Sequence, residues 1–457
     1  MTTNIIALRS EHETLPGELA PRPTSLEDTG LSLTYLCDLV CKHLAEAGVL
    51  DLGALSKRVG LPGSLVEELL GQLRATSRVE VLGAIDGSPF LRFGLTNQGR
   101  LSASEASQRD GYVGPAPVPL SDYARIVEAQ SGRHQPLTRE RVHAAFDDTV
   151  INTALLDRLG PAVNSGRPLF IYGPAGTGKS FIARRLSRLL GPPVLVPHAI
   201  AVGDSAVRCL DPGVHHALTP ADAGSVMLQH GFDARYVLCE RPTVIAGGEL
   251  TVAMLDLQYD SAGRVYRAPL QLRANNGLLL LDDLGRQRSS PASLFNRWII
   301  PLEERRDHLS LKSGQHFTVP FDLVLVLSTN LDPHQLADDA FLRRIGYKVP
   351  FEPATRDEYT AILWQECQRN GVHWDPALAE YLIDELHSAH DVPMLPCHPR
   401  DLLGLALDYC HYHGGQGVDA QALSWAWDNY FVDPGATGHS HMASGALTDE
   451  PTEGVLQ

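Results

Sequence analysis

The 457-residue chain lacks any apolar run approaching the roughly 20 residues that a membrane helix needs. Its seven cysteines are scattered without a Cys-x-x-Cys pair, which argues against a disulfide framework and is typical of reduced thiols. The N-terminal residues are too polar for a secretory signal. A net charge of −16 argues against general nucleic-acid binding. These absences favour a cytoplasmic protein without membrane insertion, and the length allows two or three domains.

One glycine-rich motif is present in full. Residues 173–180 read Gly-Pro-Ala-Gly-Thr-Gly-Lys-Ser, after the apolar run 169–172 and before apolar residues at helical spacing. Between a strand and a helix, such a loop directs backbone N–H groups and the helix dipole at an anion. Lys179 is expected to reach the β- and γ-phosphates, and the Ser180 hydroxyl to hold Mg²⁺. The sequence therefore predicts a nucleoside triphosphate site formed by Gly173, Pro174, Ala175, Gly176, Thr177, Gly178, Lys179, Ser180 and Phe181.

Two further apolar runs end in polar residues. Residues 277–281 are followed by Asp282 and Asp283. At the end of a buried strand, Asp282 can hold Mg²⁺ directly or through water, and Asp283 can polarise an attacking water. The run 321–327 precedes Asn330, which can position water near a γ-phosphate. We expect these side chains to complete a site for Mg²⁺ and nucleotide hydrolysis.

Three arginines follow these motifs along the chain. Arg343 and Arg344 lie at the end of a predicted helix, and Arg400 opens a later one. Taken singly, each is equally typical of an exposed helix end. Phosphoryl transfer, however, requires positive charge near the spreading negative charge of the transferred group, and the guanidinium fork suits that role.

This order of motifs, over roughly residues 146–430, resembles the AAA+ ATPases. The resemblance implies ATP as the nucleotide, the loop as Walker A and the two acids as Walker B. It also implies Asn330 as the first sensor, Arg343 or Arg344 as a finger acting on a neighbour's nucleotide, and Arg400 as the second sensor. A finger acting between subunits requires a homo-oligomer, expected to be a ring. The family usually has Glu where this chain has Asp283, which is one methylene shorter, so slow hydrolysis is expected.

A hairpin pattern in residues 303–321, with a turn at Ser313-Gly314, runs directly into the Asn330 segment. AAA+ proteins of the pre-sensor hairpin branch carry such an element, among them MoxR-like ATPases and enhancer-binding activators. The segment 295–304 is similar to the preceding helix in those activators. Their Gly-Ala-Phe-Thr-Gly-Ala loop is absent, which argues against that specific role.

The chain is expected to be an α/β protein, with a parallel P-loop sheet followed by an all-helical lid. Three helical patterns and two alternating strands before it resemble a small α+β winged-helix domain. The predicted organisation is an arm (1–30, disordered), the winged-helix-like domain (31–103), a linker (104–145), the ATPase core (146–350), the lid (351–432) and a disordered tail (433–457).

The charges of the winged-helix-like domain bear on which kind of partner the chain binds. Residues 31–103 hold seven basic and seven acidic residues, and the third helix carries Glu67 and Glu68. This favours docking of a protein over DNA binding, which needs a basic face. Aromatic residues near glycines in 243–269 fit a pore-facing loop or a hairpin packed on the sheet. The first hypothesis is an ATPase that remodels a protein partner; the second is a DNA-binding regulator whose assembly is switched by ATP.

Overall fold

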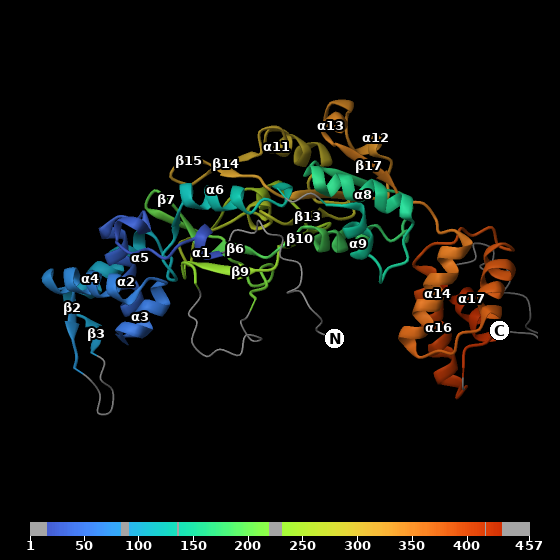
Figure 1. Cartoon of the computed structure of the whole chain (residues 1–457), viewed down its shortest axis with the longest axis horizontal. Coiled ribbons are helices and arrows are strands. Elements are labelled where there is room, and N and C mark those ends of the chain that lie inside the picture. The colour runs from blue at the N-terminus through green and yellow to red at the C-terminus, as the bar shows by residue number, and fades with distance from the viewer. Residues whose placement is uncertain (1–15, 84–90, 135–136, 219–230, 416, 432–457) are drawn as a thin grey trace, which may run out of the picture. The chain divides into compact units, whose positions relative to one another are not determined.

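The computed structural model describes residues 16–83, 91–134, 137–218, 231–415 and 417–431 (Figure 1). The chain divides into two compact units, Met1–Phe351 and Glu352–Gln457, close to the predicted boundary between core and lid. The predicted tail and the first half of the predicted arm lie outside the described residues. Within the described ranges, no helix is both long and apolar enough to span a bilayer.

A five-stranded parallel sheet forms the centre of the first unit, and it confirms the predicted α/β fold class. Its strands, in spatial order, are β10 (Thr243–Ala246), β13 (Leu278–Leu281), β16 (Val324–Thr329), β5 (Leu169–Tyr172) and β17 (Tyr347–Pro350). Alternate side chains of the three inner strands, β13, β16 and β5, enter two separate hydrophobic cores, one on each face. Both faces of these three strands are therefore buried, which is why they read as continuous apolar runs in the sequence.

Helices cover the two faces of this sheet. One core contains side chains of α8 (Thr153–Ser165) and α9 (Lys179–Arg185). The other contains side chains of α10 (Leu270–Arg273), α11 (Pro291–Glu304) and α13 (Asp339–Arg344). Between α11 and β16 lies the predicted hairpin, made of β14 (Arg306–Ser310) and β15 (His316–Pro320). Gly314 has a φ of 85° in its turn, which confirms the predicted turn position.

The N-terminal module, residues 33–95, contains the three predicted helices and both predicted strands. These are α2 (Leu33–Ala47), α3 (Leu52–Val59), α4 (Gly63–Ala75), β2 (Val79–Val81) and β3 (Arg92–Leu95). A short strand that the sequence pattern did not indicate, β1 (Val49–Asp51), pairs with β3 in the order β1-β3-β2. The connection between the two predicted strands, residues 84–90, lies outside the described residues.

A second, mixed sheet adjoins this module. Its strands are β11 (Gln258–Asp260), β12 (Val265–Arg267), β8 (Ser205–Arg208), β7 (Ala199–Val202) and β4 (Val118–Pro119). Ala199, Ala206 and Val265 share one hydrophobic core with the helices of the N-terminal module. A separate antiparallel pair, β6 (Val194–Pro197) and β9 (Tyr236–Cys239), lies in the same part of the sequence. The module is thus packed on this sheet through a common core.

The second sheet bears on the two structures considered for residues 243–269. Thr243–Ala246 is the edge strand of the central sheet, and the aromatic hairpin β11–β12 joins the second sheet. Tyr266 is only 8% exposed, and its ring packs against Tyr259 with centroids 4.8 Å apart. The hairpin is therefore part of a sheet, which favours the second of the two structures considered for these residues.

The structure corrects the predicted linker at 104–145. This segment contains the end of α5 (Asn97–Arg109), the strand β4, α6 (Leu120–Ala129), a 3₁₀ turn η2 (Gly132–His134) and α7 (Arg139–Ala144). Tyr123, Ile126 and Val127 on α6 are buried. The proline-rich sequence is compatible with a sheet because β4 is an edge strand, where a missing N–H costs no ladder hydrogen bond.

Part of the predicted arm is also ordered. Residues 16–30 contain α1 (Pro16–Leu19) and a 3₁₀ turn η1 (Glu27–Thr29). Ala20 is buried and accepts a hydrogen bond from the Asp233 amide (2.8 Å), and Arg235 donates to the Thr29 carbonyl (2.8 Å). The sequence pattern did not indicate this order, because the buried Arg235 that holds Thr29 lies 206 residues away in the sequence.

The second unit is helical throughout its described residues, as predicted. It consists of α14 (Arg356–Asn370), α15 (Pro376–Glu380), the π-helix η5 (Tyr381–His387), α16 (His398–His413) and α17 (Ala420–Tyr430). Thr355 and Glu358 form a capping box at the start of α14. Leu382, Leu402 and Trp427 belong to one core shared by these helices.

Candidate functional site

The glycine loop joins β5 to α9, as predicted. Gly173, Gly176 and Gly178 have φ values of 142°, 84° and 86°, conformations that side chains with a Cβ rarely adopt. A Cβ at Gly173 would also lie 2.1 Å from the Phe351 carbonyl oxygen. The glycines are therefore required by the backbone path of the loop itself, and Gly173 also by its packing against residue 351.

Lys179 is the first residue of α9 and is 6% exposed. Its ammonium donates to the carbonyls of Gly173 (2.8 Å) and Pro174 (2.6 Å), so it lies over its own loop. Burial lowers its pKa, while Asp283 and Asp282 oppose this shift. The loop thus holds a partly desolvated cation at the point where the sequence predicts phosphate.

Ser180 and Asp282 are in direct contact, although 102 residues separate them. The Ser180 hydroxyl donates to Asp282 Oδ1 at 2.8 Å. The Asp282 amide is in turn bound to the Ala246 carbonyl (2.8 Å), which fixes the end of β13 against β10. A hydroxyl and a carboxylate at this spacing are hard oxygen donors, the kind that Mg²⁺ prefers in combination with phosphate oxygens. These two residues fit the predicted Mg²⁺ site.

Asp283 has a left-handed backbone, with φ of 51°. Its exposed carboxylate accepts a hydrogen bond from the Asn330 amide at 3.3 Å. The site therefore brings together the acid predicted to polarise water and the residue predicted to position it. Non-glycine residues in this region are strained, and Asp is among those that tolerate it best.

Gln287 is a site residue that sequence reasoning missed. Its side-chain nitrogen donates to the carbonyls of Asp282 (3.0 Å) and Asp283 (3.1 Å), and its oxygen accepts from the Gly285 amide (2.7 Å). These three bonds hold the turn in which Asp283 sits. No sequence spacing indicates the role, because an amide side chain four residues beyond an acid has no distinctive pattern.

The order of the strands explains why these residues meet. β16 lies between β5, which leads into the glycine loop, and β13, which leads into the two acids. The Leu284 amide donates to the Ser328 carbonyl (2.7 Å), and the Thr329 hydroxyl donates back to the Leu284 carbonyl (2.7 Å). Because the strands are parallel, their carboxyl ends share one edge, where Ser180, Asp282, Asp283 and Asn330 converge.

The two predicted finger arginines lie elsewhere. Arg344 is paired with Glu303 (2.5 Å) and donates to the Ala340 carbonyl (2.9 Å). Arg343 is exposed, and no hydrogen bond or ion pair joins it to another described residue. Both line a cavity together with Pro168 and Leu323, which precede β5 and β16. They are therefore at the amino ends of the strands, opposite the glycine loop.

Arg400 belongs to the C-terminal unit, in the first turn of α16. Its side chain is 70% exposed and pairs with the adjacent Asp401 at 2.8 Å. The hydrogen bond to Asp401 raises its pKa further, so it carries a full positive charge. Its predicted role toward a nucleotide stays a prediction.

A family model described as a domain of unknown function (DUF8689) matches residues 355–429, within the C-terminal unit. No curated protein matches the chain. Among solved structures, the chain is similar to the RuvB Holliday junction branch migration motor of Thermotoga maritima, with 12% identity, 63% of this chain and 72% of that chain covered, and a TM-score of 0.37.

Two further similar structures are NtrX from Brucella abortus and domain III of the Thermotoga maritima replication initiation protein DnaA. NtrX is 14% identical over an alignment that covers 69% of this chain and 60% of the NtrX chain, with a TM-score of 0.38. The DnaA domain is 15% identical, with coverages of 63% and 97% and a TM-score of 0.34. Likeness at this level says nothing about activity, which has to be judged from the residues of the chain itself.

Proposed function

We propose that the chain is an AAA+ ATPase of the pre-sensor hairpin branch, which binds Mg·ATP and works as a homo-oligomer, a ring in the simplest case. The observation that carries the proposal is the 2.8 Å contact between Ser180 and Asp282. It joins the end of the phosphate loop to the end of the acidic strand, in the arrangement that a Mg²⁺–triphosphate site needs. The hairpin β14–β15 directly before β16 supports the assignment to this branch.

The chemistry follows from the positions of the side chains. Bound Mg²⁺ would neutralise charge on the phosphate oxygens, with Ser180 and Asp282 as its protein ligands. Lys179, already partly desolvated, exchanges its two loop carbonyls for phosphate oxygens. Asp283 and Asn330 together orient a water molecule toward the terminal phosphate. The short Asp283 side chain has a smaller reach than Glu, so turnover is expected to be slow.

The energy of hydrolysis is used, in this proposal, to remodel a protein partner that the N-terminal module recruits. The module has the helices and strands of a winged helix, but the exposed face of α4 carries Glu67 and Glu68. Two of its cations are paired with acids of the module: Arg78 with Asp38 (3.8 Å) and Arg58 with Glu46 (3.4 Å). Such a face repels phosphate, so docking of a protein is favoured over a DNA-binding regulator.

The test is ATP hydrolysis by the purified protein as a function of its own concentration, with the mass of the assembly measured in parallel. Activity per mole is expected to rise as the larger species forms, because each site needs a neighbour. The matched control is Lys179→Ala, which should lose nucleotide binding and all turnover. A constant activity per mole from a monomer would discard the oligomeric ATPase. In the same preparations, a steep salt dependence of duplex DNA binding would favour the DNA-binding regulator instead.

A further inference from the structure

A cavity of about 280 Å³ lies at the amino ends of β5, β16 and β17, beside the end of α11. We call it the arginine pocket because Arg167, Arg305, Arg343 and Arg344 line it. Glu303 is the one carboxylate among its lining residues. A chain with a net charge of −16 has therefore gathered four guanidinium groups around one opening.

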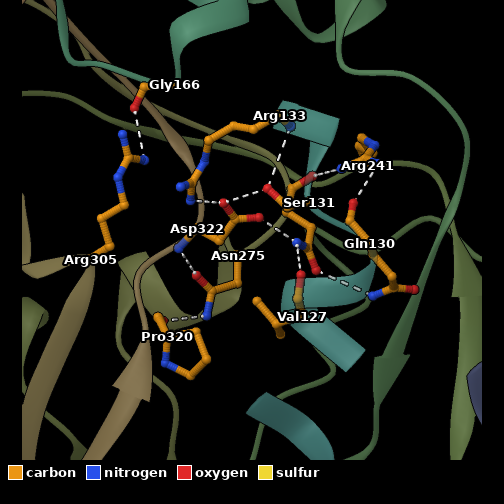
Figure 2. Close-up of polar contacts among 11 residues, drawn as sticks. Val127, Gln130, Ser131, Arg133, Gly166, Arg241, Asn275, Arg305, Pro320 and Asp322 are labelled. Atoms are coloured by element: carbon orange, nitrogen blue, oxygen red, sulfur yellow. Dashed lines mark hydrogen bonds and ion pairs between the residues drawn. The ribbon is translucent and has the colours of Figure 1, made fainter. Parts of the chain in front are cut away.

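Among the described residues, no ion pair joins Arg167, Arg305 or Arg343 to a carboxylate. Glu303 is paired with Arg344 at 2.5 Å. Asp322, whose charge acts on Arg305, is also engaged by the Ser131 hydroxyl (3.0 Å), the Asn276 amide (2.7 Å) and the Arg133 guanidinium (Figure 2). That network ties the start of β16 to η2, so the Asp322 carboxylate is shared with several donors outside the pocket.

Arg305 shows the cost of this arrangement. It ends α11 with φ of 56°, a left-handed conformation that Asn or Gly adopts more easily. Burial lowers its pKa, and the neighbouring positive charges of Arg133 and Arg167 lower it further, against the opposing effects of Asp322 and Glu128. Within the described part of the chain, its guanidinium makes one hydrogen bond, to the Gly166 carbonyl at 3.3 Å (Figure 2). A strained, half-buried cation with one weak contact is costly for folding alone.

The opposite wall is also shaped around an arginine. Arg167 precedes β5, and its aliphatic stem lies against Gly346, which precedes β17. A Cβ at Gly346 would lie 2.7 Å from Arg167 Cδ and 2.8 Å from its Cβ. The missing side chain thus leaves room for Arg167 at the rim of the pocket, facing the same opening as Arg305.

We propose that the arginine pocket binds a phosphate-type oxyanion, with Arg305 and Arg167 as its principal ligands. Guanidinium groups bind such anions through paired N–H donors, and an anion would offset the mutual repulsion that lowers the pKa of Arg305. This site is separate from the glycine loop, which lies at the carboxyl ends of the same strands. Its phosphate belongs either to a free compound or to a nucleotide held by a second copy of this chain; the second source rests on the proposed function.

The experiment titrates inorganic phosphate into full-length protein by calorimetry at constant ionic strength. All proteins carry Lys179→Ala, so that the glycine loop does not contribute. One phosphate per chain is expected to bind, and Arg305→Asn should weaken the affinity at least tenfold. Arg158→Gln, which neutralises an exposed arginine on α8, is the matched control and should bind as the parent does. Equal affinity in Arg305→Asn, or no binding in the parent at millimolar phosphate, would overturn the proposal.

Two further measurements are needed. The first tests whether Arg305→Asn folds normally, and the second identifies the source of the phosphate. Asn suits the left-handed position, so Arg305→Asn should unfold at the same temperature as the parent or higher. With Lys179 intact, loss of ATP-dependent assembly in Arg305→Asn identifies a nucleotide on a second copy, whereas unchanged assembly identifies a free phosphate compound. Nucleotide binding to the loop is read separately with a fluorescent analogue. If the loop binds none, the proposed function fails, and the phosphate titration still decides the pocket.

Discussion

At the scale of single residues, the phosphate loop could be predicted because its glycines are dictated by backbone conformation. A φ of 84° or 86° excludes most side chains, so Gly176 and Gly178 leave a visible mark in the sequence. Gln287 leaves none, because its three hydrogen bonds depend on a turn that the sequence does not reveal. The sequence predicted that Ser180 and Asp282 both hold Mg²⁺, but it did not predict the direct hydrogen bond between them.

Replacement of the water-orienting acid is the sharpest test at this scale. Asp283→Asn should keep the left-handed turn, because Asn tolerates positive φ and has the same size. Nucleotide binding should then stay within about twofold of the original, while turnover falls by about 100-fold or more through loss of the general base. Steady-state hydrolysis and equilibrium binding of a fluorescent nucleotide measure the two effects. Asp147→Asn, at an exposed position, serves as the control; unchanged turnover in Asp283→Asn would remove the residue from the catalytic site.

At the scale of elements, the central strands could be predicted because both of their faces are buried. The short edge strands could not be predicted from the sequence pattern. β13 and β16 are continuous apolar runs because both of their faces are covered. β1 and β4, of three and two residues, carry no period that a pattern could show. The all-helical character of the C-terminal unit could be predicted because its helices bury apolar side chains at helical spacing in a shared core. The π-helix η5 is a departure that helical spacing alone does not distinguish.

The contact between η5 and α16 predicts a pH dependence for the C-terminal unit. His398 at the start of α16 stacks on His387 at the end of η5, with ring centroids 5.2 Å apart, and both are 3% exposed. Burial, and secondarily the charge of His387, lowers the pKa of His398 to about 4. Burial lowers the pKa of His387 as well. A histidine in the unfolded chain has a pKa of about 6.5. Below that pH, the unfolded chain therefore binds more protons than the folded one.

The stability of this unit is therefore complete above about pH 6.5 and decreases as the pH falls toward 4. For His398 alone the expected loss of unfolding free energy at pH 5 is about 2 kcal/mol. Denaturant unfolding at several pH values, followed by tryptophan fluorescence, measures it, since four of the five tryptophans lie in this unit. His398→Asn removes the titrating ring and should flatten the dependence. If wild type and variant lose stability in parallel, protonation elsewhere is responsible.

At the scale of the whole molecule, the sheet separates two charged sites. The glycine loop and the acids occupy the carboxyl edge, and Arg343 lies at the amino edge. Arg343 is exposed and unpaired among the described residues, whereas Arg344 is held by Glu303. Arg343 is therefore the better candidate for the proposed finger toward the nucleotide of another copy. The sequence could not separate these two arginines, because the pairing depends on a glutamate 41 residues away.

A mixture of two inactive variants tests whether sites are shared. Lys179→Ala should abolish the loop of a subunit and leave its Arg343 intact; Arg343→Ala should do the reverse. If the finger acts between subunits, an equimolar mixture contains interfaces in which an intact loop faces an intact arginine. Random assembly makes these about a quarter of all interfaces, so about a quarter of wild-type turnover should return.

The control for this mixture is Arg158→Ala in place of Arg343→Ala. That variant keeps its loop and its finger, so it should be active alone and show no gain beyond dilution. Hydrolysis after mixing and exchange of subunits, with assembly mass measured on the same sample, gives the result. A mixture of Lys179→Ala and Arg343→Ala that forms the full assembly and yet stays as inactive as its components would show that Arg343 does not act on a neighbour. The separation of the two sites across one sheet would then have to be bridged by movement within a single chain.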